Sequence, residues 1–131
     1  MERFIIRRET DVGIAVVATQ ARARELGFHR SDIDRLATAV SELARNIIKY
    51  APDQGGDIVL TDQSGEKGLR LSVEARDNGP GIADLEAALQ DHFSTSGSLG
   101  LGLPGVKRLM DEFSIVSVPG RGTVVSIALV R

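Results

Sequence analysis

The sequence predicts an α+β fold, a two-layer sandwich in which helices cover one face of a mostly antiparallel sheet. Hydrophobic residues recur with helical spacing up to residue 50 and then alternate as in strands from residue 58. The predicted helices are grouped and do not alternate one by one with strands, which is typical of this architecture. With 42% hydrophobic and 26% charged residues, we expect the 131 residues to form one domain, spanning 1–131.

The N-terminal part is predicted to form a short strand and then a helix. The strand is the apolar run Phe4–Ile6. The helix is expected to be capped by Thr10 or Asp11 and to end at Leu26, because Gly27 is a typical residue after a helix end. Its buried side is predicted from helical spacing to be Val12, Ala15, Val16, Thr19, Ala23 and Leu26.

A second helix is expected to begin at Ser31, where Asp34 three residues later resembles a capping box. The turn-rich cluster Pro52–Gly56 ends it. Its apolar stripe is clear from the spacing of Ile33, Leu36, Ala37, Val40, Leu43, Ala44, Ile47 and Ile48.

An antiparallel hairpin is predicted to follow this helix. Ile58 and Leu60 share one face of its first strand, and the turn is expected at Ser64 and Gly65. The inner face of the second strand is predicted to consist of Leu69, Leu71, Val73 and Ala75. A loop over Asp77–Gly81 comes next.

The last third is predicted to hold helices and a second hairpin. A short helix is expected over Asp84–Gln90, a loop over Phe93–Gly97, and a long helix with Pro104 in its first turn. The buried stripe of the long helix is expected to be Leu103, Val106, Leu109, Met110 and Phe113. The final strands are predicted over Ile115–Val118 and Thr123–Val130.

Composition excludes several classes of function. A net charge of −2 without a basic block, together with only 4% aromatic residues, argues against nucleic-acid binding. No apolar run approaches a membrane span and the N-terminus lacks a signal-peptide core, so we expect a cytoplasmic protein with no membrane contact. The absence of cysteine excludes disulfides, thiolate metal sites and a cysteine nucleophile.

Glu42 and Asn46 lie four residues apart, on the same side of the second predicted helix and on the flank of its apolar stripe. One interpretation is a solvated polar face shared with Arg45 and Lys49. The other is a carboxylate base beside an amide oxygen that can bind a hard cation such as Mg²⁺. The pair alone does not decide between them.

Asp77 has the same strand parity as the residues that are predicted to face the core. A carboxylate aimed inward is costly unless it receives hydrogen bonds. It is either a strand-end residue that caps its own turn or an acceptor for a purine amine at the bottom of a pocket. Gly79 and Gly81 would let the backbone pass close to a flat ring.

The segment Gly100–Gly105 has the form G-x-G-x-x-G. A dinucleotide-binding fold would need a strand before it and an acidic residue about twenty positions later. Residues 92–99 do not have the pattern of a strand, and Gly120–Gly122 contains no acid. What remains is a glycine-rich approach to a helix N-terminus, which favours phosphate binding.

Together these three segments resemble a known family. ELARNIIKYA, DNGPGI and GLGLPGV resemble the N box and the two glycine boxes of the GHKL ATPase superfamily, the Bergerat fold. The small size resembles its branch of anti-sigma factors and switch kinases. The stretches Val40–Asn46, Phe93–Gly97 and Gly100–Phe113 look like those of the serine/threonine switch kinases of the stressosome.

The resemblance implies ATP and Mg²⁺ as cofactors and a role for each matching residue. Glu42 would be the general base and Asn46 the Mg²⁺ ligand, while Asp77 would bind the adenine amine. The resemblance also implies that Gly79 and Gly81 shape the base pocket, that Gly100 and Gly102 cradle the phosphates, and that Thr123 contacts adenine through water. Ser98 departs from the Gly or Arg usual at its position, so the contact to the γ-phosphate is left open.

The function implied is an ATP-dependent protein serine/threonine kinase. Its substrates would be STAS-domain antagonist proteins, and after release it would activate a PP2C-type phosphatase. One alternative is an anti-sigma factor that holds a sigma factor while phosphorylating its antagonist. Another is a nucleotide-gated binding module without catalysis, against which the presence of Glu42 argues.

The back of the first predicted helix is unusually apolar. It carries Ile14, Val17, Ala18 and Ala21, where a surface helix normally has charged residues. We hypothesise that this face, with the edge of the strand Phe4–Ile6, forms a homodimer or docks a regulatory partner.

Overall fold

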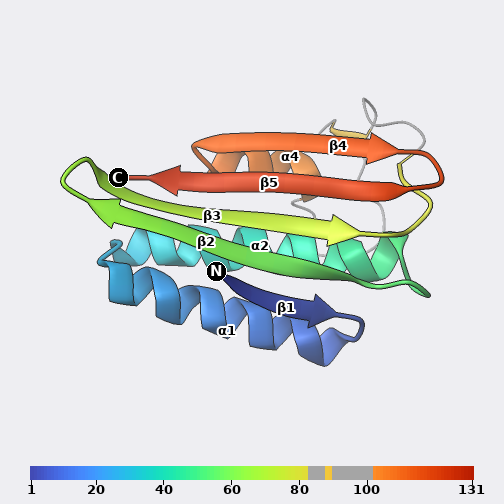
Figure 1. Ribbon diagram of the computed structural model, residues 1–131, viewed down its shortest axis with the longest axis horizontal. Helices are drawn as coiled ribbons and strands as arrows, with labels where there is room; N and C mark the ends of the chain where they lie inside the picture. Colours follow the sequence, from blue (N-terminus) through green and yellow to red (C-terminus); the bar gives the residue numbers. More distant parts are fainter. Residues whose placement is uncertain (83–87, 90–101) are drawn as a thin grey trace.

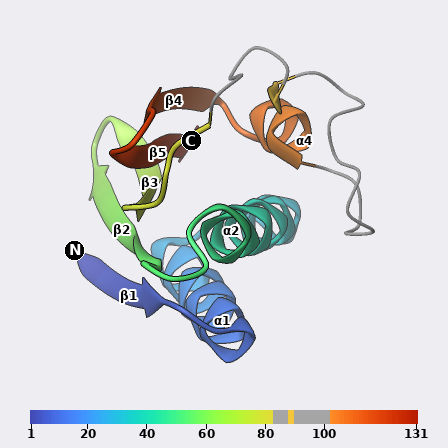
Figure 2. The same cartoon turned by 90° about the vertical axis from the view of Figure 1, so that its right-hand side faces the viewer.

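The computed structural model describes residues 1–82, 88–89 and 102–131. In these ranges the strands form a five-stranded antiparallel sheet in the order β1-β2-β3-β5-β4. The helices of the described ranges, α1, α2 and α4, all lie on one face of it (Figures 1 and 2), which confirms the predicted α+β class. The elements are β1 (Glu2–Ile6), α1 (Glu9–Leu26), α2 (Arg30–Tyr50), β2 (Gly56–Gly65), β3 (Gly68–Asp77), α4 (Gly102–Leu109), β4 (Glu112–Val118) and β5 (Gly122–Val130).

The core lies between the sheet and α2, which packs against α1 on one side and α4 on the other (Figure 2). Alternate residues along each strand point toward the helices, and these residues form the sheet side of the core. The inner residues of the three central strands are buried: Ile58, Leu60, Leu71, Val73, Val125, Ile127 and Leu129. From α2, Leu36, Val40, Leu43 and Ile47 pack against them.

The beginning of α1 differs from the prediction. The helix starts at Glu9, with Arg8 at the N-cap, so Thr10 and Asp11 are both inside its first turn. Asp11 nevertheless accepts hydrogen bonds of 2.9 Å from the backbone amides of Arg7 and Arg8, which lowers its pKa. A carboxylate in the first turn can thus satisfy amides ahead of it without being the cap. Gly27 ends the helix with φ +93°, as predicted.

The beginning of α2 also differs. The helix starts at Arg30 with His29 at the N-cap, so the predicted capping box of Ser31 and Asp34 does not form. Asp32, two residues after the helix start, turns inward and is only 2% exposed. It is held by ion pairs, which explains why the helix starts there without a side-chain cap.

Two smaller predictions are corrected. The first hairpin turns at Glu66 and Lys67, since β2 continues through Gly65. Helix α4 is short and ends at Leu109, so Phe113 belongs to β4. The helix ends there because Asp111 already joins the sheet, donating its amide to Ala128 of β5. The predicted loop over residues 93–97, and the short helix over 84–90 apart from 88–89, lie outside the described residues.

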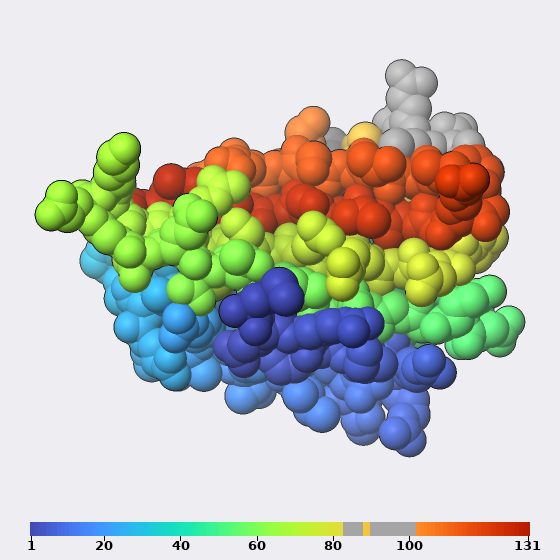
Figure 3. All heavy atoms as spheres, in the orientation of Figure 1, coloured from blue at the N-terminus to red at the C-terminus, as the bar shows by residue number. Residues whose placement is uncertain are grey.

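The opposite face of the sheet is turned to the viewer in Figure 3. On this face Asp57 of β2 is only 6% exposed, because Arg3 and Arg76 both bond to it at 2.6–3.1 Å. Burial acts to raise the pKa of Asp57, but these two guanidinium groups outweigh it and the pKa is lowered.

No helix in the described part of the chain is long and apolar enough to cross a membrane.

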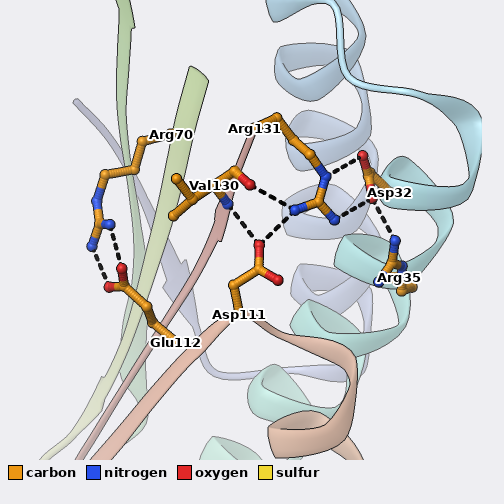
Figure 4. Close-up of polar contacts among 7 residues, drawn as sticks. All are labelled: Asp32, Arg35, Arg70, Asp111, Glu112, Val130 and Arg131. Atoms are coloured by element: carbon orange, nitrogen blue, oxygen red, sulfur yellow. Dashed lines mark hydrogen bonds and ion pairs between the residues drawn. The ribbon is translucent and has the colours of Figure 1, made fainter. Parts of the chain in front are cut away.

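A second polar cluster, which we call the Arg131 clasp, joins the end of β5 to the helices (Figure 4). Arg131 donates to Asp32 at 2.8 and 3.0 Å and to Asp111 at 2.7 Å, and Arg35 donates to Asp32 at 2.6 Å. The hydrogen bond from Arg131 is the main cause of the lowered pKa of Asp32. The clasp therefore fixes the start of α2 against the last strand.

We expect Asp32→Ala to lower the free energy of unfolding by about 2–4 kcal/mol, because two arginines lose their buried partner. The exposed Asp34, in the same helical turn, is the matched control, and Asp34→Ala should cost less than about 0.5 kcal/mol. Urea unfolding of both variants measures this. Equal losses would show that the clasp contributes no special stability.

The same contribution should depend on pH. The folded-state pKa of Asp32 is lowered, so its stabilisation is complete above the unfolded-state value of about 3.9 and is lost as the pH falls through the folded value. The difference in unfolding free energy between the wild type and Asp32→Ala should therefore be constant near neutrality and shrink below about pH 4. A difference that instead grows in acid would contradict this assignment.

Candidate functional site

The candidate site lies at the end of the sheet where β3 finishes, beside the C-terminal half of α2 (right in Figure 1, toward the viewer in Figure 2). A hollow there is lined by Leu43, Asn46, Ile47, Tyr50, Ala75, Asp77, Ile82, Leu103, Thr123 and Val125. Its volume of about 20 Å³ is roughly that of one water molecule.

Asp77 is the last residue of β3 and pairs with Thr123 of β5. Its Oδ1 atom accepts a hydrogen bond of 2.9 Å from the Gly79 amide, and the Thr123 amide donates to the carboxylate as well. Burial raises the pKa of Asp77, and these two hydrogen bonds act against the rise. Asp77 thus caps its own turn and also lines the hollow, so the two sequence interpretations do not exclude each other.

Asn46 lines the hollow from α2, and Glu42 lies one helical turn before it. The sequence placed Glu42 on the flank of the apolar stripe, whereas the structure buries it to 5% exposure. Within the described ranges its carboxylate makes no hydrogen bond or ion pair. Because no fully buried side-chain oxygen or nitrogen atom among these residues lacks a hydrogen-bond partner, the carboxylate oxygens retain contact with solvent.

The loop after Asp77 is held by close backbone packing. A Cβ on Gly79 would lie 2.6 Å from the carbonyl oxygen of Tyr50, and one on Gly81, which has φ +81°, would lie 2.7 Å from that of Val118. The Pro80 carbonyl accepts from the Gly120 amide at 2.7 Å. These contacts explain why glycine is needed here, and the proximity of Gly79 and Gly81 to a base stays a prediction.

Thr123 is 5% exposed, and its hydroxyl lies 2.8 Å from that of Ser117 on β4. Ser117 Oγ also accepts from the Ile82 amide at 2.7 Å. Sequence reasoning missed Ser117, although its alternation with Ile115 and Phe113 along β4 gives it the inner-face parity. It therefore links the glycine loop to β5.

The second glycine box is described only in part. Gly102 is the first residue of α4 and has φ +55°. Gly100 and Ser98 lie outside the described residues. Among the residues that are described, no cluster of three acidic or histidine side chains could hold a metal. Asn46 would offer one oxygen, which would fit Mg²⁺ because this ion takes few protein ligands and completes its shell with water and phosphate oxygens.

Comparison with known proteins identifies the family. Residues 31–131 match the family described as histidine kinase-, DNA gyrase B-, and HSP90-like ATPase. The chain belongs to this ATPase family. The matched range begins at α2 and includes Glu42, Asn46, Asp77 and Thr123.

Within this ATPase family, the chain is similar to the serine/threonine-protein kinase RsbT of Bacillus subtilis (strain 168). The two are 51% identical over 118 residues, which cover 90% of this chain and 87% of RsbT. It is also 30% identical over 128 residues to the anti-sigma F factor of Thermoanaerobacter sp. (strain X514), covering 95% and 89%. These relatives confirm the predicted branch of anti-sigma factors and switch kinases.

Solved structures agree on the fold. The mycobacterial sensor histidine kinase MprB matches with a TM-score of 0.57 and 21% identity over 98% of this chain and 96% of its own. The catalytic domain of the histidine kinase ThkA matches with a TM-score of 0.54 and 19% identity over 99% and 96%. At these identities the likeness concerns the fold alone.

Proposed function

We propose that this protein serine/threonine kinase binds Mg-ATP at the hollow beside α2 and phosphorylates STAS-domain antagonist proteins in a partner-switching pathway. The observation that carries the proposal is the 51% identity to RsbT. The family match and the meeting of Asp77, Asn46 and Thr123 at one hollow support it. Phosphoryl transfer needs mainly positioning and charge stabilisation, which such a site can provide.

The adenine end of the site is assigned to Asp77 and Thr123. The Asp77 carboxylate accepts a hydrogen bond from the exocyclic amine, and Thr123 supports the ring beside it. Gly79 and Gly81 shape the loop over the base, while Gly102 brings its backbone amide near the phosphates at the start of α4. Gly100, in the same glycine box, keeps the phosphate-binding role that the resemblance implies. Asn46 is the protein ligand for Mg²⁺, which when bound neutralises phosphate charge.

Glu42 is assigned as the general base. It lies one helical turn from Asn46, is buried, and has no partner among the described side chains. It takes the proton of the attacking serine or threonine hydroxyl while the oxygen bonds to the γ-phosphorus and the bond to ADP breaks. A carboxylate that no other described side chain occupies is available for this task.

The likeness to RsbT also supports a second step. After phosphorylation releases the antagonist, the free kinase activates a PP2C-type phosphatase. The 30% identity to an anti-sigma F factor supports the alternative, in which the chain sequesters a sigma factor. The higher identity to RsbT favours the switch kinase. Glu42 argues against a binding module without catalysis.

The decisive experiment is incubation of the protein with Mg-ATP and purified candidate STAS-domain proteins, followed by intact-mass measurement. A phosphate added to one of them supports the kinase. Capture of a sigma factor by the immobilised protein, without phosphatase activation, would instead favour the anti-sigma factor. No phosphate transfer to any candidate, with ATP still bound, would favour the binding module.

Glu42→Ala should reduce phosphoryl transfer by a factor of about 100 or more and leave Mg-ATP affinity nearly unchanged, because it removes only the base. Asn46→Ala should weaken Mg-ATP binding itself. Calorimetry and a transfer assay on both variants test this division. Arg45→Ala, exposed on the same helix, is the control that should change neither quantity. A comparable loss of ATP affinity in Glu42→Ala would refute it.

Asp77 should make the wild type prefer ATP over GTP by at least about tenfold, because guanine places an oxygen where adenine has its amine and would leave the carboxylate unpaired. Asp77→Asn should lose most of this preference, since an amide can donate as well as accept. Titration of each nucleotide into both proteins measures the ratio. Equal affinities in the wild type would exclude this role for Asp77.

We further propose that the outer face of α1 mediates a homodimer or docks a regulatory partner. Ile14 and Val17 are 59% and 64% exposed there. Val17→Glu should abolish self-association or partner capture and leave ATP affinity unchanged, because the face is remote from Asp77. Light scattering and pull-down provide the readouts, with Arg24→Glu on the same helix as control. If Val17→Glu alters neither, the exposed apolar face of α1 has no role in binding.

A further inference from the structure

We propose that an open groove on the outer face of the sheet binds an acidic segment of a partner protein. The groove has a volume of about 500 Å³ and lies at the end of the sheet where β3 finishes (right in Figure 1). It is on the opposite side of the sheet from α1, α2 and α4, so it is distinct from the outer face of α1. The inference does not depend on the proposed phosphoryl transfer.

A single row of paired residues crosses the groove from one edge of the sheet to the other. The row has one residue from each strand: Ile5, Asp57, Arg76, Val124 and Val116. Neighbouring strands lie about 4.8 Å apart, so the row is about 19 Å long, a distance that an extended chain of about six residues spans. The two ends of the row are apolar and its middle is charged.

The groove is positively charged although the whole chain is not. Four arginines and two aspartates line it, a net charge of +2, whereas the chain as a whole carries −2. The arginines are Arg3, Arg7, Arg76 and Arg121. Among the described residues, the side chains of Arg7 and Arg121 have no hydrogen-bond or ion-pair partner. A local excess of positive charge on an acidic protein indicates an anionic partner, because complementary charges favour association.

The other two arginines are held in place by Asp57. Its carboxylate accepts one hydrogen bond from Arg3 at 2.6 Å and two from Arg76 at 2.9 and 3.1 Å. A guanidinium group has five N–H donors, so most of the donors on both arginines are left for another acceptor. Because the buried Asp57 already orients these two groups, a ligand carboxylate pays less entropy to bind them.

Exposed apolar side chains flank the arginines. Ile5, Val116 and Val118 line the groove and are 49%, 62% and 44% exposed. They are three of the seven large hydrophobic residues that are exposed in the described ranges. Apolar groups gathered beside polar ones are typical of protein interaction sites. The groove therefore suits a segment that has apolar residues on both sides of a cluster of carboxylates.

Other occupants fit this groove less well. A second copy in a symmetric dimer would bring the same positive surface against itself, and like charges repel. Nucleic acid would neutralise the arginines, but none of the described residues that line the groove is aromatic, so bases would find no stacking partner. A protein segment with carboxylates and apolar side chains satisfies both the arginines and the exposed valines.

The probe for the experiment is a fluorescent peptide in which two leucines are separated by five glutamates. In an extended chain this spacing places the leucines about 20 Å apart on one side. Fluorescence anisotropy with the full chain should give a Kd below about 1 mM in about 50 mM salt, and binding should weaken about threefold or more in about 300 mM salt. Peptides with glutamine in place of glutamate, or serine in place of leucine, should each bind at least about threefold more weakly.

Variants of the protein test the two kinds of contact separately. Arg121→Glu and Val116→Thr should each weaken peptide binding about threefold or more. Matched controls lie at the other end of the same sheet: Lys67→Glu reverses a charge in the turn between β2 and β3, and Val130→Thr changes an exposed valine of β5. Neither control should weaken binding by more than about 1.5-fold. Arg7→Glu is a second test of charge if Arg121→Glu folds poorly.

Equal weakening by Lys67→Glu and Arg121→Glu would mean that the peptide responds only to net charge, and would overturn the inference. So would undiminished binding of the glutamine peptide, or no binding of the acidic peptide to the wild type. Sedimentation that revealed a dimer disrupted by Arg121→Glu would assign the groove to a second copy. Tighter binding of a short single-stranded oligonucleotide than of the peptide would assign it to nucleic acid, and either result would likewise overturn the inference.

Discussion

The site depends on the pairing of β3 with β5, which carries Asp77 and Thr123 onto the face that otherwise forms the core. Asp77 lies on the same face of β3 as the buried Leu71 and Val73, so its carboxylate points inward. Hydrogen bonds from two backbone amides offset the cost of burying it there. Gly122 has no Cβ to collide with the Asp77 carbonyl, so the strands can come together at this point. The register of β3 against β5 therefore determines both which residues pack in the core and which residues line the candidate site.

Much of this could be predicted from the sequence because it depends on periodicity. The apolar stripe of α2, the alternation in β3 and the glycine loop after Asp77 follow from local spacing, and together with the boxes they indicated the fold and family. The helix starts were predicted wrongly: Asp11 bonds to the amides just ahead of it from inside the first turn, and Asp32 is held by a partner that local sequence does not specify. Arg131 is 99 residues from Asp32, and no capping rule anticipates it. Ser117 was missed for a related reason, since its importance comes from lying opposite Thr123 in the folded sheet.

Two acidic residues of α2 have different surroundings. At the start of the helix the Arg131 clasp pairs Asp32 with two arginines, whereas Glu42, in the middle of the helix, has no side-chain partner among the described residues. The first arrangement stabilises the fold. The second leaves the Glu42 carboxylate unoccupied beside Asn46, which supports its proposed role.

Hydrogen bonds hold the glycine loop in place beside the candidate site. Pro80 is tied to Gly120 and Ile82 to Ser117, so the loop that would face a base is attached at two points to β4 and to the turn that follows it. A loop fixed in this way presents its groups in one orientation, which lowers the entropic cost of recognising a ligand. Ser117 and Gly120, which hold the loop, lie outside the hollow. A search limited to the lining residues would therefore identify Asp77 and Thr123 but not the contacts that fix the loop beside them.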